Sequence, residues 1–391
     1  MKKETFKISM YAYPWDLADE GLDVSLGRIK DLARCDEIIL TPCYHRGDYL
    51  LPHHPIHPIY FGEPGAIYYE PEAYRYGTTS IRPIVSGKVN DVDYFESIVA
   101  GITGHGLQFG AWVVYANQDQ LVGKYPHFAR QDAFGISYNG QLSLFPCDVR
   151  EYFFALTKEV IDRFAPKSVF IESLGRQGFP VPPKRQVEID LRCQYLLSLC
   201  FHPSSIALVN EAGMDGDYFQ KQVREYVQSR LENANKTDMG DPASSEWVDT
   251  AFDGLLRKYL QITRASVADL WEKIIEIIHN SGAEVHMSPV NEARFYGNDL
   301  EYRLNRFCDR VCYEPLGKMT STEVEALREN AGVDAKVLFY WDRHFESQEE
   351  ATATLSDAIE SGCDGATVYN YGLLTARQLQ NVGAASATLL S

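Results

Sequence analysis

The chain alternates strand-length apolar runs with helix-length segments from one end to the other, and this alternation constrains the fold more than any other feature. Eight runs are predicted to be strands: residues 5–13, 36–43, 107–116, 167–173, 283–290, 309–314, 335–342 and 364–370. Strands that alternate with helices favour parallel pairing through helical crossovers. Eight such units that end in a helix predict an α/β fold of the (β/α)8 type, a closed TIM barrel.

Helical spacing of apolar residues marks the segments between these runs. The predicted helices span residues 24–33, 92–103, 149–164, 300–307, 321–330, 348–361 and 375–390. The chain has 391 residues, 45% of them hydrophobic. A single barrel domain over residues 1–391 accommodates this length, because barrels with insertions reach it.

Two connections are much longer than the few residues that usually join such elements. Residues 44–90 are rich in Pro, His, Tyr and Gly, which predicts an ordered loop that lines one end of the barrel. Residues 176–281 form a predicted helical insert, with helical spacing in 187–210, 218–233 and 247–280. The insert is a lid, a subdomain or the contact of a homo-oligomer, and the sequence leaves these three open.

The charge balance excludes several classes of partner. A net charge of −17 argues against nucleic acid and against an anionic membrane surface, since both require clustered Lys and Arg. The N-terminus has no apolar stretch of signal-peptide length, and no segment has the length of a membrane span. The eight cysteines are scattered, mostly in apolar runs, and no pattern of zinc ligands is complete. We therefore expect a cytoplasmic protein with reduced thiols.

Three predicted strands run directly into a carboxylate, and these are the candidate catalytic residues. Glu172, Glu314 and Asp342 follow apolar runs at residues 168–171, 311–313 and 337–341. A charge at the end of a buried strand is costly unless it has a purpose, and the strand ends of a barrel share one mouth. The alternative for Asp342 is a salt-bridged turn with Arg343, which follows it in the chain.

Aromatic and polar side chains gather at the other strand ends, where a polyhydroxylated ligand would offer C–H faces and hydroxyl edges. The predicted substrate contacts are Tyr13, Trp15, Asp16, His45, Arg46, Tyr49, Trp112, Asn117, His286, Trp341 and Asn370. A small carbohydrate is therefore the expected substrate. Glu172, His286 and Glu314 also suggest a metal cage as an alternative. No compact ligand spacing supports it, and neither a metal nor a cofactor is expected.

Several short motifs in the first half of the chain resemble a bacterial group of TIM-barrel proteins related to glycoside hydrolases. These motifs are Tyr13-Pro14-Trp15-Asp16-Leu17, Tyr44-His45, Gly110-Ala111-Trp112-Val113, Asp132-Ala133-Phe134-Gly135, Pro146-Cys147-Asp148-Val149-Arg150 and Ile171-Glu172-Ser173. The resemblance implies a (β/α)8 fold and hydrolysis of a sugar substrate with Glu172 at the centre. The chain departs from the group at residues 182–185, where related chains carry a His-His-Glu-Lys run.

The leading functional hypothesis is a glycoside hydrolase that uses two carboxylates. Glu172 takes the acid/base role and Asp342 the role of nucleophile, with Glu314 as the competitor of Asp342. A carboxyl separation of ~5 Å indicates retention, and ~6.5 to 9.5 Å indicates inversion. The alternatives are a metal-dependent sugar isomerase, epimerase or lyase that uses Glu172, His286 and Glu314, and a sugar-binding relative without activity.

Overall fold

A computed structural model of the chain describes residues 6–175, 178–233, 244–288, 308–315, 319–332 and 334–390. Eight parallel strands form its centre: β1 (Lys7–Ala12), β2 (Glu37–Tyr44), β6 (Gln108–Val114), β9 (Ser168–Glu172), β10 (Glu284–Met287), β11 (Arg310–Tyr313), β12 (Lys336–Trp341) and β13 (Gly365–Val368). β1 pairs with β13 on one side and with β2 on the other, which closes the ring. The predicted TIM barrel is confirmed. Each of the eight predicted strands overlaps one of these, and β2 ends one residue beyond its predicted bound.

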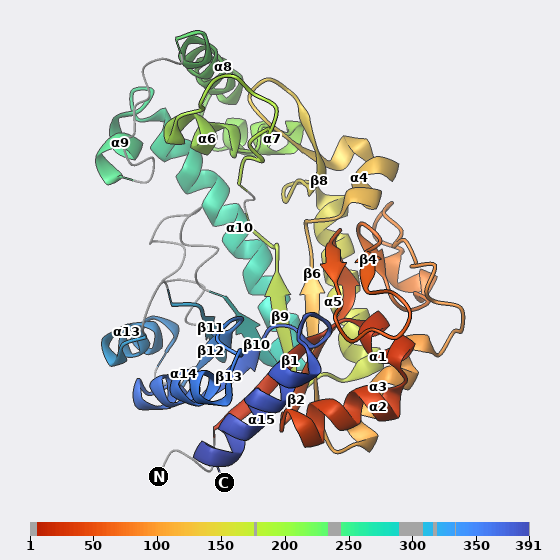
Figure 1. The fold of residues 1–391 in the computed structure, drawn as a ribbon. Helices are drawn as coiled ribbons and strands as arrows, with labels where there is room; N and C mark the ends of the chain where they lie inside the picture. The colour runs from red at the N-terminus through yellow and green to blue at the C-terminus, as the bar shows by residue number, and fades with distance from the viewer. Residues whose placement is uncertain are drawn as a thin grey trace.

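Helices surround the ring and connect its strands (Figure 1). They are α1 (Pro14–Glu20), α2 (Leu22–Gly27) with η2 (Arg28–Leu32), α3 (Tyr94–Gly104), α5 (Cys147–Phe164), α10 (Leu255–Asn280), α13 (Ser321–Ala331), α14 (Gln348–Glu360) and α15 (Ala376–Leu390). The helices predicted at 24–33, 92–103, 149–164, 321–330, 348–361 and 375–390 are confirmed, whereas α1 was not predicted. The helix predicted at residues 300–307 lies outside the described residues.

The connection after β2 carries secondary structure of its own. It contains the hairpin β3 (Asp48–Leu50) and β4 (Ile59–Phe61), then β5 (Ala66–Ile67), which pairs antiparallel with the carboxyl end of β2, and the short helix η3 (Ala73–Tyr76). A second excursion between β6 and α5 consists of α4 (Asp119–Lys124), η4 (Pro126–Phe128) and the hairpin β7 (Ala129–Gln131) and β8 (Ser137–Leu142). The sequence had indicated only the first of these two excursions.

Between β9 and α10 lie α6 (Leu191–Leu197), α7 (Pro203–Glu211), α8 (Gly216–Glu232) and α9 (Ser245–Thr250). The continuous helices predicted over 187–210 and 247–280 are wrong, because each is two helices. Pro203 is the first residue of α7, and a proline cannot continue a preceding helix. The second break falls at Phe252, Asp253 and Gly254, whose backbones are left-handed.

Two clusters of buried apolar side chains hold the molecule together. The larger fills and surrounds the barrel, and the smaller joins α6 to α9 with the β7–β8 region. α10 belongs to both, since Leu256, Tyr259 and Leu260 lie in the smaller cluster, whereas the segment from Val267 to Ile278 packs on the barrel. Figure 1 shows α10 running from α6–α9, beyond the carboxyl ends of β6 and β9, down to the side of the barrel.

Candidate active site

The barrel interior can be recognised from a polar layer near the start of the strands. Glu37 of β2 accepts hydrogen bonds from Ser9 (2.7 Å), Ser168 (3.0 Å) and Arg310 (2.6 Å), which come from three other strands. Side chains from four strands around the ring can meet at one carboxylate only inside the barrel. Because side chains on one face repeat every second residue, the inward face of β9 also carries Glu172.

Glu172 stands at the carboxyl end of β9 with two nitrogen groups around it. The indole Nε1 of Trp112, on the neighbouring strand β6, donates to Glu172 Oε2 at 2.5 Å. His45, directly after β2, places Nε2 3.5 Å from Glu172 Oε1. The side chain of Glu172 is 25% exposed. It is therefore held from two sides and still reaches solvent at the mouth.

The position of the His45 ring indicates its charge. Its Nδ1 lies 2.6 Å from the carbonyl oxygen of Arg46. A carbonyl only accepts, so Nδ1 carries a proton, and a neutral ring would then turn the lone pair of Nε2 toward the carboxylate. Burial lowers the pKa of His45, but the hydrogen bond to Glu172 and its charge outweigh burial and raise that pKa above 6.5. The contact with Glu172 thus favours the protonated form of the His45 ring.

An aromatic wall surrounds this pair. The Tyr13 hydroxyl lies 3.1 Å from that of Tyr44 and 3.0 Å from that of Tyr369, so one chain of phenols links β1, β2 and β13. Burial, followed by the neighbouring phenols, raises the pKa of Tyr13 well above its ordinary value, so the hydroxyl stays protonated. The ring of Trp112 packs edge-on against Tyr44, 4.8 Å between centroids. Tyr369 was not predicted, although it stands at a strand end like the others.

Asp342 and Glu314 are joined through one cation. Arg343 Nε lies 2.8 Å from Asp342 Oδ1 and its NH2 group 2.6 Å from Glu314 Oε1. Both carboxylates line the same hollow on the β11 and β12 side of the mouth. Glu314 is 44% and Asp342 28% exposed. The structure therefore pairs the two competitors with each other, and the predicted Asp342–Arg343 salt bridge is present.

Four predicted substrate contacts lie in the core. Trp15 is stacked between Tyr13 (4.5 Å between ring centroids) and Tyr60 (4.9 Å) and is fully buried. Asp16 is buried beneath Tyr13, and burial raises its pKa well above the ordinary value. Trp341 and Asn370 are also fully buried. Trp341 packs on Phe345, and Asn370 caps the helix η5 (Tyr371–Leu373). All four side chains therefore belong to the packed interior.

The remaining predicted contacts differ in exposure. Arg46 is 67% exposed, 3.9 Å from Asp48. Tyr49 is half-buried against Tyr13, with 5.1 Å between the ring centroids. Asn117 is half-buried just after β6, where its backbone pairs with that of Gln141 in the second excursion.

His286 has a role that differs from a metal ligand. It is fully buried inside the barrel, and its ring lies edge-on to Phe170, 4.8 Å between centroids. Burial, followed by the charge of Arg310, lowers the pKa of His286 well below its ordinary value, so the ring is neutral. Among the described residues, which include Glu172, His286 and Glu314, no three His, Cys, Asp or Glu side chains form a group that could hold a metal ion. The alternative of a cage made by these three residues is therefore wrong.

Two further expectations concern the chain as a whole. None of the eight cysteines, which all lie within the described residues, forms a disulfide, and six of them are buried. Within the described ranges, no helix is long and apolar enough to cross a membrane.

Comparison with known proteins gives structural likeness alone, because no family model and no curated protein matches the sequence. The structure is similar to α-L-fucosidase isoenzyme 2 from Paenibacillus thiaminolyticus (TM-score 0.60, 11% identity, 98% of this chain and 49% of that one). It is also similar to the catalytic domain of β-amylase from Paenibacillus polymyxa (0.56, 11%, 99% and 98%). A third similar structure is β-galactosidase from Marinomonas ef1 (0.57, 8%, 98% and 59%).

The chain therefore has the barrel fold of these enzymes. It spans about half of the fucosidase and three fifths of the galactosidase, but nearly all of the β-amylase domain. At 8 to 11% identity the likeness extends to the fold alone.

Proposed function

We propose that the chain is a glycoside hydrolase that acts on a small glycoside or oligosaccharide, with Glu172 as one of its two catalytic carboxylates. The observation that carries the proposal is the setting of Glu172. It is a partly exposed carboxylate on the inward face of a strand end, held by Trp112 and facing His45. The similar structures are a fucosidase, an amylase and a galactosidase, and a glycoside hydrolase is consistent with that likeness.

The paired imidazolium supports the acid/base role for Glu172. An acid/base residue gives a proton to the leaving oxygen and later takes one from water. A protonated His45 would first give its Nε2 proton to Glu172 across their 3.5 Å separation, so that Glu172 can act as the acid, and the proton that Glu172 later takes from water would return to His45. His45 acts here as a positioning residue.

Asp342 is the favoured nucleophile. Both of its oxygens accept from Arg343, at 2.8 and 3.2 Å, which fixes the carboxylate, whereas Glu314 accepts through one oxygen only. These roles would preserve the anomeric configuration, because two successive displacements restore it.

The test is a screen of aryl glycosides and oligosaccharides with the wild type, Glu172→Gln and a matched surface variant, Glu225→Gln, in α8. Loss of a general acid/base costs about 10²- to 10⁴-fold in rate, so Glu172→Gln should lose that much on its best substrate. Glu225→Gln should retain full activity. Equal turnover by Glu172→Gln and the wild type would refute the catalytic role.

A second comparison assigns the partner carboxylate. Asp342→Asn should abolish turnover of all substrates, because the nucleophile is needed whatever the leaving group. Glu314→Gln should reduce it less. The reverse ranking would give the role of nucleophile to Glu314.

The cytoplasmic location and an oligomer contact in residues 176–281 also remain predictions.

A further inference from the structure

A hollow lies at the amino-terminal end of the barrel, opposite the end that carries Glu172. All eight strands of the ring contribute to its wall, either with the first residue of the strand or with the residue just before it. Lys7 and Gln108 begin β1 and β6, for example, and Lys167 directly precedes β9. The hollow measures about 510 Å³, which is within the range of roughly 300 to 1,000 Å³ for small-molecule sites.

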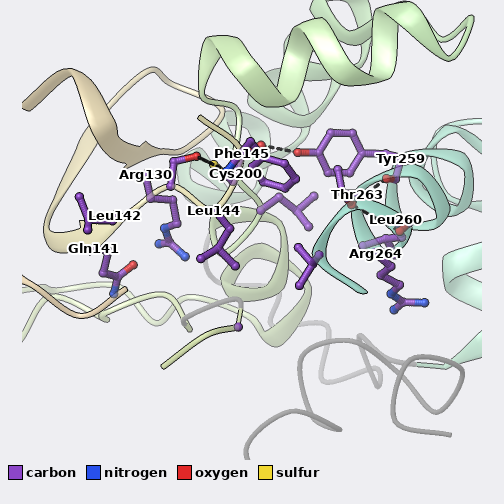
Figure 2. A pocket seen from close by; sticks show the side chains of 14 residues that line it. Arg130, Gln141, Leu142, Leu144, Phe145, Cys200, Tyr259, Leu260, Thr263 and Arg264 are labelled. Atoms are coloured by element: carbon purple, nitrogen blue, oxygen red, sulfur yellow. Dashed lines mark hydrogen bonds between the residues drawn. The ribbon is translucent and has the colours of Figure 1, made fainter. Parts of the chain in front are cut away.

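A different hollow, between the β7–β8 excursion and α10, does not reach this size. Figure 2 shows its walls, with Leu142 and Leu144 on one side and Leu260 of α10 on the other. Its volume is about 50 Å³, several times below the range of roughly 300 to 1,000 Å³. The amino-terminal end of the barrel is therefore the better candidate for a second ligand site.

The three carboxylates that line the large hollow are each paired with a cation. Glu37 and Glu284 both accept from Arg310, which is only 8% exposed. Asp364 pairs with Arg328 of α13. The negative charges of the wall are therefore compensated within the protein, and the buried guanidinium is held in place before a ligand arrives, which lowers the entropic cost of binding.

Two lysines of the wall have no such partner. Lys7 and Lys167 are exposed, and within the described ranges neither side chain makes an ion pair or a hydrogen bond. Together with Arg310 and Lys336, they bring four cations from four strands to one hollow, against three carboxylates. In a chain of net charge −17 this is a local exception. The hollow therefore favours an anion, which would offset the repulsion between the lysines.

The other groups of the wall indicate what the anion carries. A lysine ammonium is a compact point charge of the kind that binds phosphate. Ser9 and Gln108 add neutral polar groups that can hydrogen-bond to hydroxyls, and Leu338 adds a small apolar area. A hollow of about 510 Å³ has room for a phosphate group together with an organic body.

We propose that this hollow binds a small phosphate ester with a hydroxylated body. The phosphate lies between Lys7 and Lys167, and the body lies toward Ser9 and Gln108. The site goes beyond the proposed hydrolysis and does not depend on it, because Glu172 stands at the opposite end of the strands.

The test measures binding of myo-inositol 1-phosphate to the full chain by calorimetry, beside neutral myo-inositol and inorganic phosphate. The ester should bind in a saturable way, phosphate several-fold more weakly, and inositol not measurably. Lys7→Gln and Lys167→Gln should each weaken binding of the ester about tenfold, as for the loss of one charge-assisted hydrogen bond. Lys221→Gln removes the same charge from α8, where Lys221 pairs with Glu225, and should bind the ester like the wild type. Glu172→Gln should also bind it like the wild type.

Lysine acetylation of the wild type locates the site without a variant. The saturating ester should slow the reaction of Lys7 and Lys167 with acetic anhydride several-fold and leave that of Lys221 unchanged, with mass spectrometry as the readout. Four results would each overturn the proposal. They are no saturable binding of the ester, equal affinity for the ester and inorganic phosphate, equal weakening by Lys167→Gln and Lys221→Gln, and unchanged acetylation of Lys7 and Lys167 at saturation.

Discussion

At the scale of single residues, the site depends on donors that surround Glu172 rather than on Glu172 alone. Trp112 is buried in the aromatic wall and donates to the carboxylate, and His45 faces it from the next loop. Both residues are predictable from sequence as strand-end aromatic and polar groups. Their contact with Glu172 is not, because it depends on the pairing of β2, β6 and β9.

Trp112→Phe removes the indole donor and keeps an aromatic ring in the wall. We expect kcat to fall about 10-fold or more with KM little changed, as for the loss of one charge-assisted hydrogen bond to a catalytic group. Trp15→Phe is the matched control, since Trp15 is buried in the same cluster and does not contact Glu172. Both variants should lose a similar free energy of unfolding. Equal loss of kcat in the two would show that packing, not the donor, matters.

His45→Gln tests the charge of the pair through pH. The pKa of His45 is raised in the folded protein, so its charge stabilises the fold below the unfolded value of about 6.5, and this contribution is lost as the pH rises through the folded value. The difference in free energy of unfolding between wild type and His45→Gln should therefore be largest below about pH 6.5 and shrink as the pH rises above that value. Urea titrations across this range measure it.

The same measurement in a Glu172→Gln background completes a double-mutant cycle. There the effect of His45→Gln should not vary with pH in this way, because the carboxylate that raises the pKa is absent. A pH dependence that persists would assign it to another group.

At the scale of elements, the barrel was predictable and its interior was not. An apolar run marks each strand in the sequence, because a strand that is buried on both faces consists almost entirely of hydrophobic residues. The carboxylate at the start of β2 and the arginine at the start of β11 are 273 residues apart in the chain, and only closure of the ring brings them together. Closure of the ring also determines which face of each strand packs against the helices. The burial of Trp341 and Asn370 follows from this arrangement.

Glu37→Ala should lower the free energy of unfolding by about 3 kcal/mol or more. Arg310 keeps Glu284 as its second partner, but three buried donors, from Ser9, Ser168 and Arg310, lose their acceptor, and each loss costs about 1–3 kcal/mol. Asp249→Ala breaks an ion pair with Arg257 in which both side chains are over 40% exposed, and it should cost less than about 1 kcal/mol. Chemical denaturation of the two variants measures both. Similar costs would mean that the polar layer is solvated.

The last helix, α15, packs closely against η2 of the first β/α unit, and Gly383 lies at the contact. A Cβ on Gly383 of α15 would lie 1.8 Å from the carbonyl oxygen of Leu32, whereas a Cβ on Gly123 of α4 would meet nothing within 4 Å. Gly383→Ala should therefore destabilise the fold by over ~1 kcal/mol, as overpacking does. Gly123→Ala should stabilise it by about 0.4–1 kcal/mol. Thermal melts would contradict this view if the two substitutions shifted Tm in the same direction.

At the scale of the whole molecule, α10 joins two regions with separate apolar clusters. Its first turns pack with α6–α9, and its later turns pack on the barrel beside α5. The predicted insert over residues 176–281 therefore includes a helix that the barrel itself uses. Helical periodicity reveals such a helix but not its partners, so the sequence could not divide it.

We expect the smaller cluster to open before the barrel does. Cooperative units with less buried apolar area open at lower free energy, so amides of α8, held by Phe219, Val223 and Val227, should exchange with solvent sooner than those of α5. α10 supplies an internal control, since its residues near Leu256 should exchange with α8 and those near Ile274 with α5. Native-state hydrogen exchange at increasing denaturant measures both. A single transition shared by the two helices would mean that α6–α9 and the barrel unfold as one unit.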